Sequence, residues 1–253
     1  MKFGGASVAS ASSFTNLADL IIGRHHSYPY LVVVVSAMGQ TTDQLIELAK
    51  QVHPNPPQRE YDMLISAGER ISMSLLAMSL CLKGKEAISF TGSQSGILTC
   101  GRHTDAQIID VKPYRLIHAL KQNKIVIVAG FQGVSPEKEI TTLGRGGSDT
   151  SAVALGAALG AEKIEFFKDV PGIFEQDPKI NAKAVRYASM TYEEAYAIAS
   201  RGARILHPRA ILLAAKNGLP LYVQSFIPSD HHSSGTYVED KKIRKPPIPI
   251  FEI

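Results

Sequence analysis

The sequence predicts an α/β fold: a three-layer αβα sandwich around a largely parallel central sheet. Short apolar runs recur along the 253 residues, and helical patterns lie between them. The runs at 30–36 (YLVVVVS) and 124–130 (KIVIVAG) are continuously apolar and β-branched, which is typical of strands buried on both faces. Alternating strands and helices favour parallel pairing, because each helix can provide the crossover between two strands.

Each strand is expected where an apolar, β-branched run ends in glycine or in a polar turn. The short run at the N-terminus is included because two glycines follow it. The six expected strands are 2–5, 30–36, 86–92, 124–130, 162–170 and 219–226.

The expected helices carry apolar side chains at intervals of three or four residues. Phe14, Leu17 and Ile21 show this spacing in the first of them. Pro113 stands at a first-turn position and Gly218 follows a helix end, where these residue types are common. The expected helices are 11–26, 42–52, 61–82, 113–122, 149–159, 191–200 and 208–217.

Three further segments do not fit the alternating pattern. Segments 96–109 and 133–144 are polar and broken by turns, which favours hairpins or flaps added to the sheet. The C-terminal tail, 239–253, is rich in lysine and proline, and we expect a linker rather than a packed element.

The composition is that of a globular protein and excludes several classes of function. Hydrophobic residues make up 45% of the chain, which is enough for a sizeable core. The net charge is +4, but the basic residues are scattered, so no nucleic-acid partner is expected. The two cysteines and the histidine pairs lack the spacing of metal ligands. Neither a signal peptide nor a membrane span is expected, which indicates a cytoplasmic protein.

Four glycine-containing segments follow expected strands, so we expect them at one edge of the sheet. Ligands of parallel sheets bind at the carboxyl ends of the strands. Glycine lets backbone N–H groups approach phosphate oxygens closely, and a helix N-terminus adds partial positive charge. A single turn of this kind is ordinary, whereas four at one edge indicate a ligand site. The segments are 4–7, 36–39, 130–133 and 168–172.

Four charged residues near this edge are candidate site residues, and three of them have a plainer alternative. Lys2 precedes a Gly-Gly pair, where an ammonium can reach a transferring phosphoryl group; alternatively, it is a surface charge. Glu69 interrupts an apolar helix, either as a site residue or on a solvated face. Asp149 begins a helix four residues after Arg145, either as an N-cap or beside a bound anion.

The common phosphate-binding motifs are absent from the sequence. It contains neither GxxxxGK[ST] of P-loop NTPases nor the HRD and DFG motifs of protein kinases. The segment 144–149 (GRGGSD) also lacks the GxGxxG spacing of dinucleotide-binding folds.

Seven motifs, taken together and in this order, resemble those of aspartate kinases, which have the amino acid kinase fold. The resemblance extends from Lys2 to about Thr236, and the combination of KFGG with RGGSD is specific within that fold. It implies a catalytic domain over 1–238, whose part from about residue 160 is the nucleotide lobe, followed by the tail. The motifs are KFGGASV (2–8), VVVSAMGQTTDQL (33–45), SAGERIS (66–72), GFQGV (130–134), GRGGSDTSAVALGAALGA (144–161), KDVPGIFEQDPK (168–179) and GARILHP (202–208).

The resemblance implies a role for each matched residue. Lys2 and Asp149 are the implied catalytic residues: Lys2 stabilises the transferred phosphoryl group, and Asp149 orients the lysine. The implied substrate-binding residues are Ser36, Thr42, Glu69, Arg145 and Ser148. The implied nucleotide-binding residues are Lys2, Gly4, Gly5, Ser7, Lys168, Asp169, Phe174, Asp177, Lys179 and Arg204.

Five matched positions depart from the usual pattern of the family. Ala6 stands where threonine or serine is usual, Lys168 replaces threonine, and Phe174 replaces tyrosine. Lys179 and Arg204 exchange the usual arginine and lysine, which differ in geometry although both are cationic. All but Ala6 lie on the nucleotide side, so the departures concern the nucleotide more than the acceptor.

The implied reaction is the ATP-dependent phosphorylation of the β-carboxylate of L-aspartate to 4-phospho-L-aspartate. This is the first step of the diaminopimelate route to lysine and of threonine and methionine biosynthesis. ATP and Mg²⁺ are the implied cofactors, with Mg²⁺ held mainly by the nucleotide phosphates. Two alternatives stay open: a kinase of the same fold for another acceptor such as glutamate, and a catalytically weak subunit that binds an amino acid or a nucleotide.

Most aspartate kinases continue into regulatory ACT domains, and these 253 residues contain none. Three interpretations follow: a stand-alone catalytic domain without feedback control, a catalytic subunit with a separate regulatory chain, or part of a longer chain. A homodimer and a separate regulatory subunit are therefore both open as partners.

Overall fold

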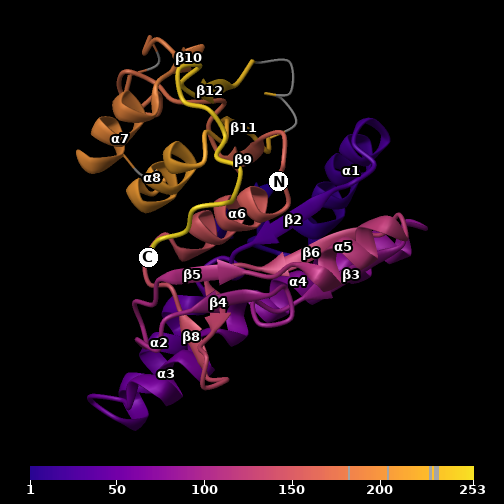
Figure 1. Cartoon of the computed structure of the whole chain (residues 1–253), viewed down its shortest axis with the longest axis vertical. Helices are drawn as coiled ribbons and strands as arrows, with labels where there is room; N and C mark the ends of the chain where they lie inside the picture. Colours follow the sequence, from indigo (N-terminus) through magenta and orange to yellow (C-terminus); the bar gives the residue numbers. More distant parts are fainter. Residues whose placement is uncertain (182, 204, 228–229, 231–233) are drawn as a thin grey trace.

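A largely parallel sheet forms the centre of the molecule (Figure 1), as predicted. The computed structural model describes residues 1–181, 183–203, 205–227, 230 and 234–253. In this part of the chain, eight strands lie in the order β10-β12-β11-β9-β1-β2-β6-β3, and every neighbouring pair is parallel except β11 and β12. They are β1 (Lys2–Phe3), β2 (Val32–Val35), β3 (Ala87–Phe90), β6 (Ile125–Ala129), β9 (Ile164–Lys168), β10 (Ser189–Met190), β11 (Leu221–Ser225) and β12 (Thr236–Val238).

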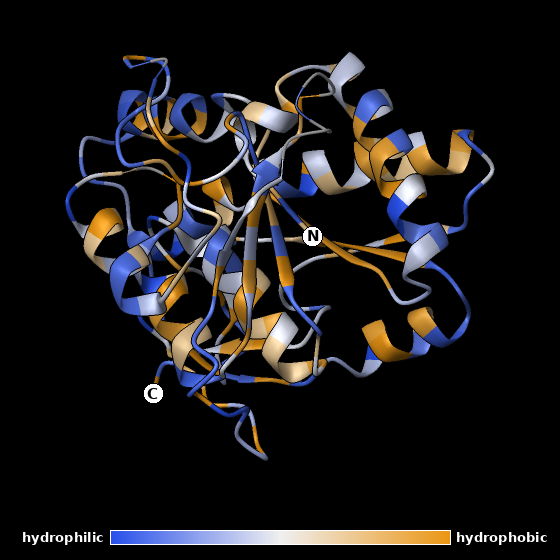
Figure 2. Cartoon of the chain, turned by 90° about the horizontal axis from the view of Figure 1, so that it is seen from above, coloured by the Kyte–Doolittle hydropathy of each residue, from blue (hydrophilic) through white to orange (hydrophobic). Residues whose placement is uncertain are grey.

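Helices cover both faces of this sheet, which confirms the predicted three layers. Successive side chains of β2 point to opposite faces: Val33 and Val35 belong to one apolar cluster and Val34 to another. Figure 2 shows largely hydrophobic central strands with helices on both sides. The first cluster is shared with α1 (Ala11–Ser27) and α4 (Ala67–Leu82), and the second with α5 (Tyr114–Lys121), α6 (Gly147–Ala158) and α8 (Pro208–Lys216).

The helix α7 (Tyr192–Ser200) packs against α8 at the outer end of the sheet. It begins at a capping box, in which the Thr191 hydroxyl accepts from Glu194 N and the Glu194 carboxylate accepts from Thr191 N. The helix therefore starts one residue after the predicted position.

The two turn-broken segments form hairpins, as predicted, but they build a sheet of their own. Its order is β5-β4-β7-β8, with antiparallel pairing in β4–β5 and β7–β8. The expectation that they add to the central sheet is therefore wrong. The strands are β4 (Ile97–Thr99), β5 (Ile108–Val111), β7 (Gln132–Val134) and β8 (Ile140–Thr142).

The helix predicted over 61–82 is interrupted at Ser66. Two helices result, α3 (Gln58–Ile65) and α4, and α2 (Thr41–Val52) packs against both. By length and composition alone, the stretch Gln58–Leu82 is the one described segment that could cross a membrane. This is weak evidence, because the stretch contributes Asp62 and Glu69 to the protein interior.

The tail is packed against the protein, so the prediction of a linker is wrong. Asn217, which follows α8, donates to Ile250 O at 2.8 Å and accepts from Ile250 N at 2.9 Å. Glu252 N donates to Ile108 O at 3.0 Å, and the Glu252 carboxylate pairs with Arg209. Figure 1 shows the tail running from β12 past α6 to β5. Composition missed this packing because it depends on partners that are distant in the sequence.

Candidate active site

The carboxyl ends of β1, β2 and β6 meet in one place, which brings three of the glycine segments together. Ser36 N donates to Phe3 O at 3.1 Å, and Gly130 N donates to Val35 O at 3.0 Å. The 3₁₀ helix Gly5–Val8 follows β1 directly. At Gly5, a Cβ atom would lie 3.1 Å from the carbonyl oxygens of two residues in the segment 36–39, so this close approach favours glycine. The backbone segments that follow β1, β2 and β6 therefore lie close together at this edge of the sheet.

Lys2, Asp149 and Lys168 form a buried charge cluster at this edge. Lys2 Nζ lies 2.7 Å from Asp149 Oδ1, and Lys168 Nζ lies 3.8 Å from Asp149 Oδ2. The three residues come from β1, the first turn of α6 and the end of β9. Because β9 pairs directly with β1, both lysines reach the same carboxylate. The cluster carries one net positive charge, which suits an anionic ligand.

The pKa of Asp149 is set by two opposing effects. Burial alone raises the pKa of this carboxyl, but the ammonium groups of Lys168 and Lys2 outweigh burial and lower it to about 2. Burial lowers the pKa of Lys168, and Asp149 opposes that shift. Asp149 is therefore fully ionised at neutral pH, as a fixed counter-ion for two lysines.

The N-terminus of α6 lies beside this cluster, and Gly146 forms its N-cap. Gly146 has a φ of 74° and no side chain to cap the helix, and Asp149 does not act as the cap. A Cβ atom at Gly146 would lie 2.0 Å from the ring of His207, so glycine is required both by the backbone and by packing. His207 caps α8 by accepting from Arg209 N, and its own backbone N lies 3.4 Å from Asp149 Oδ2.

Glu69 lies in the first turn of α4 and is buried, with 3% of its surface exposed. Its Oε1 accepts from Ala37 N at 3.1 Å, whereas Oε2 has no partner in the described part of the chain. Burial raises the pKa of Glu69 to about 7, although its backbone hydrogen bonds and Lys2 oppose the shift. A carboxylate so placed can bind a cation that enters the site, so the solvated-face alternative is wrong.

The other residues assigned to the acceptor lie around the same edge. Thr42 lies close to the start of α4, because a Cβ atom placed on Gly68, next to Glu69, would lie 3.6 Å from Thr42 Oγ1. A Cβ at Gly130 would lie 2.9 Å from Ser148 Cα, which places the buried Ser148 at the end of β6. Ser36 follows β2 and is half-buried. Arg145 is exposed, and its guanidinium makes no ion pair with any described residue.

The residues assigned to the nucleotide are divided between the edge and an exposed segment. Gly4, Gly5 and Ser7 lie at the edge, where Ser7 Oγ donates to Gly4 O at 2.6 Å. Asp169 follows β9 and pairs with Lys179 in an exposed ion pair. Asp177 accepts from Lys179 N at 2.9 Å, and Phe174 pairs with Arg186 in a β-bridge. Arg204 lies outside the described residues.

Acidic side chains do not gather into a metal site in the described part of the chain. No group of three or more His, Cys, Asp or Glu residues there could hold a metal ion. Asp149 faces two lysines. The described residues therefore do not by themselves form a protein cage for Mg²⁺.

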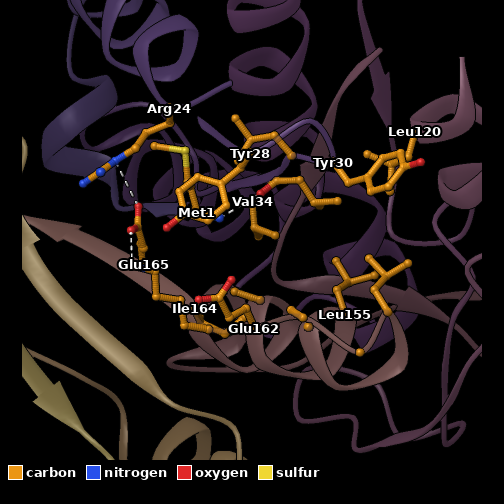
Figure 3. Close-up of a pocket in the computed structure, with 18 of the residues that line it drawn as sticks. Met1, Arg24, Tyr28, Tyr30, Val34, Leu120, Leu155, Glu162, Ile164 and Glu165 are labelled. Carbon is orange, nitrogen blue, oxygen red and sulfur yellow. Dashed lines mark hydrogen bonds and ion pairs between the residues drawn. The ribbon is translucent and has the colours of Figure 1, made fainter. Parts of the chain in front are cut away.

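A cavity of about 510 Å³ lies at the opposite end of the strands (Figure 3). It lies beside the amino ends of β2 and β9, which have four and five residues, whereas β1 between them has two. The N-terminal ammonium of Met1 donates there to Val32 O at 2.8 Å, and Arg24 pairs with Glu165 at its wall. This cavity is not the site of the charge cluster, because the cluster follows the carboxyl ends.

Sequence reasoning missed three residues that support the edge: Asp62, His207 as a neighbour of the site, and Arg209. Asp62 is completely buried and binds β8 and the loop before β5. Arg209 donates to Leu143 O, next to the glycine-rich turn. An aspartate among apolar residues (YDMLI) was a usable signal for Asp62. The other two had none, because their partners are far away in the sequence.

The chain matches the family model described as the amino acid kinase family over residues 1–225. An aspartokinase from Mycobacterium tuberculosis (strain ATCC 25618 / H37Rv) is 51% identical over 225 residues, covering 88% of this chain and 53% of that protein. Aspartokinase 2 from Bacillus subtilis (strain 168) is 46% identical over 240 residues, covering 95% and 58%. The chain thus spans about half the length of these curated relatives.

Solved structures agree with this assignment. The crystal structure of aspartate kinase from Synechocystis superposes with a TM-score of 0.84 at 44% identity, covering 97% of this chain and 40% of that one. Aspartokinase III from E. coli, in complex with aspartate and ADP, superposes with a TM-score of 0.82 at 26% identity, covering 95% and 64%. With its parallel sheet, its edge of glycine turns and these matches, the chain belongs to the amino acid kinase family.

Proposed function

We propose that the chain is the catalytic domain of an ATP-dependent aspartate kinase, which converts L-aspartate to 4-phospho-L-aspartate. The observation that carries the proposal is the Lys2–Asp149–Lys168 cluster at the carboxyl ends of the strands, with Glu69 on the neighbouring helix. The similarity to aspartokinases supports the choice of aspartate as the acceptor.

The charge cluster suits the transfer of a phosphoryl group between two anions. The β-carboxylate attacks the γ-phosphorus in line, an O–P bond forms, and the bond to the bridging oxygen breaks with its electron pair leaving on ADP. A carboxylate is already ionised at pH 7, so the reaction needs no general base. The protein has to position the two anions and offset their repulsion, which Lys2 and Lys168 do with their ammonium groups.

The acceptor binds through its own charged groups. Glu69 has one carboxylate oxygen without a partner among the described residues, and this oxygen receives the α-ammonium. The guanidinium of Arg145, which pairs with no carboxylate in the described part of the chain, binds a carboxylate of the acceptor. Ser36, Thr42 and Ser148 surround the acceptor at the ends of β2 and β6. Asp149 keeps the two lysines oriented and is not itself consumed.

The nucleotide phosphates lie over Gly4, Gly5 and Ser7, and the segment from Asp169 to Lys179 binds the rest of ATP. Mg²⁺ would neutralise phosphate charge when bound, and the phosphate oxygens of the nucleotide would be its main ligands. We further propose that the enzyme acts in the cytoplasm, as a homodimer or with a separate regulatory subunit.

The proposal is tested by measuring ADP formation with a panel of amino acids. Aspartate is expected to give the highest rate, and Lys2→Ala is expected to lower kcat by about 100-fold or more, because it removes a charge that stabilises the transition state. The exposed Lys50 on α2 provides the control, and Lys50→Ala should leave the rate unchanged.

Two outcomes would overturn the assignment. Strong activity on glutamate with none on aspartate would make the chain a kinase for another acceptor. Calorimetric binding of an amino acid or a nucleotide without turnover would make it a binding subunit.

A further inference from the structure

Asp62 is the centre of a hydrogen-bond network outside the charge cluster. It lies in α3 and is completely buried. Its carboxylate accepts from Thr104 N at 3.0 Å, from Thr142 N at 3.1 Å and from Thr142 Oγ1 at 2.6 Å. His103 Nδ1 lies 2.8 Å away, within hydrogen-bond distance. One carboxylate thus joins a helix, a strand and a loop that are distant in the sequence.

Two of these partners lead directly to the glycine-rich turn. Thr142 ends β8, three residues before Arg145. Thr104 belongs to the loop that lies behind Gly144: a Cβ at Gly144 would lie 3.1 Å from Thr104 O and from Asp105 Oδ1. Gly144 has a φ of 70°, so the backbone there turns sharply against this loop. Asp62 therefore binds both the strand that leads into the turn carrying Arg145 and the loop that packs against this turn.

On its other side Asp62 is connected to the helix that carries Glu69. Ser66 N donates to the backbone carbonyl oxygen of Asp62 at 3.1 Å, at the break between α3 and α4. Gln132 Nε2 donates to Ser66 O at 2.8 Å, which fixes this break to β7. Glu69 follows three residues later, so its position depends on the same break.

We propose that Asp62 is a positioning residue for the amino-acid acceptor: it holds the Arg145 turn at a set distance from Glu69. This rests on the proposed function, in which these two residues bind the acceptor's carboxylate and ammonium. Both groups must match one small molecule, and a displacement of about 1 Å can cost on the order of 100-fold in rate. A buried carboxylate with several donors suits this role, because any movement leaves polar groups unpaired.

The test is Asp62→Asn, which keeps the side-chain size but replaces one acceptor oxygen with a donor. The KM for aspartate is expected to rise by about tenfold or more, as for the loss of buried hydrogen bonds, with the KM for ATP changed by less than about twofold. Hydrogen exchange followed by mass spectrometry is expected to quicken in 102–106 and 141–146.

Glu165→Gln is the matched control. Glu165 is also a buried carboxylate, but it pairs with Arg24 and Lys163 at the amino end of β9. Its loss is expected to lower the melting temperature while both KM values and exchange in 141–146 stay unchanged.

A second pair of variants serves if Asp62→Asn fails to fold. Thr142→Val removes the hydroxyl donor at nearly constant volume, and it should raise the KM for aspartate and quicken exchange in 141–146 less than Asp62→Asn does. Thr142→Ser keeps the hydroxyl and should behave like the wild type. Equal increases of both KM values, or unchanged exchange in 141–146, would overturn the proposal. If the wild type accepts no amino acid, the proposed function is wrong, and exchange alone decides whether Asp62 holds the turn.

Discussion

At the residue scale, burial and neighbouring charges shift the pKa values of two carboxyl groups, Asp149 and Glu69, away from their ordinary values. Asp149 stays ionised because two ammonium groups outweigh the effect of burial on its pKa. For Glu69 burial dominates and raises the pKa to about 7, although its backbone hydrogen bonds and Lys2 oppose the shift. Two carboxyl groups in one site thus acquire different roles: a permanent counter-ion and a group that titrates near neutrality.

The raised pKa of Glu69 predicts that acceptor affinity depends on pH. Below pH 7 Glu69 is protonated and cannot bind an ammonium, so the KM for aspartate is expected to rise up to about tenfold per pH unit as the pH falls from 7 to 6. The same pKa shift affects stability. The free energy of unfolding is expected to fall as the pH rises from the ordinary pKa of 4.5 through about 7, because Glu69 ionises less readily in the folded protein than in the unfolded chain.

Steady-state kinetics between pH 6 and 8 measure this effect, with Glu69→Gln as the control. The variant should have a high KM that no longer changes with pH in this range. A wild-type KM that is flat over the same range would contradict the role given to Glu69.

At the element scale, the N-terminus of α6 is placed by its fit against α8. Gly146 lies under the ring of His207, and the backbone of His207 reaches Asp149. The start of α8 therefore contacts both the N-cap of α6 and the carboxylate of Asp149 in its first turn. Glycine is needed here for space as well as for its positive φ.

Gly146→Ala is expected to destabilise the protein by more than about 3 kcal/mol, because its Cβ would overlap the imidazole ring. Gly84→Ala is the matched control, since Gly84 has a φ of 75° and open space around its Cβ position. It should cost only about 1–2 kcal/mol, from the backbone conformation alone. Urea unfolding measures both, and equal losses would show that the ring contact does not matter.

At the scale of the whole molecule, the tail connects the last strands to the second sheet. Arg209 is central to this connection, because it pairs with Glu252 and donates to Leu143 O and Ala106 O. Glu252 also binds Ile108 through backbone and side chain. The last residues of the chain are thereby linked to the segment just before the glycine-rich turn.

Deleting residues 246–253 is expected to lower the melting temperature by about 5–10 °C, because about 3 kcal/mol of contacts are lost from a chain of this size. Glu252→Gln keeps the tail but weakens its bond to Arg209, so a smaller decrease is expected. Calorimetry measures both variants, and a deletion that leaves the melting temperature unchanged would show that the tail contributes no stability.

Much of the fold follows from local patterns. The apolar runs of β2, β6 and β9 and the helical spacing of Phe14, Leu17 and Ile21 specify the elements, because burial on one or two faces requires these periods. The glycine segments also identified the sheet edge, since a parallel sheet gathers the carboxyl ends of its strands.

The tertiary structure alone decided which groups meet at that edge. Lys168 reaches Asp149 because β9 lies beside β1, and Asp62 joins Thr104 to Thr142 across about 40 and 80 residues of chain. The packed tail and the break at Ser66 have the same origin. The physical reason is that periodicity and turn chemistry act between near neighbours, whereas ion pairs and buried hydrogen bonds depend on strand order, which brings distant residues within about 3 Å.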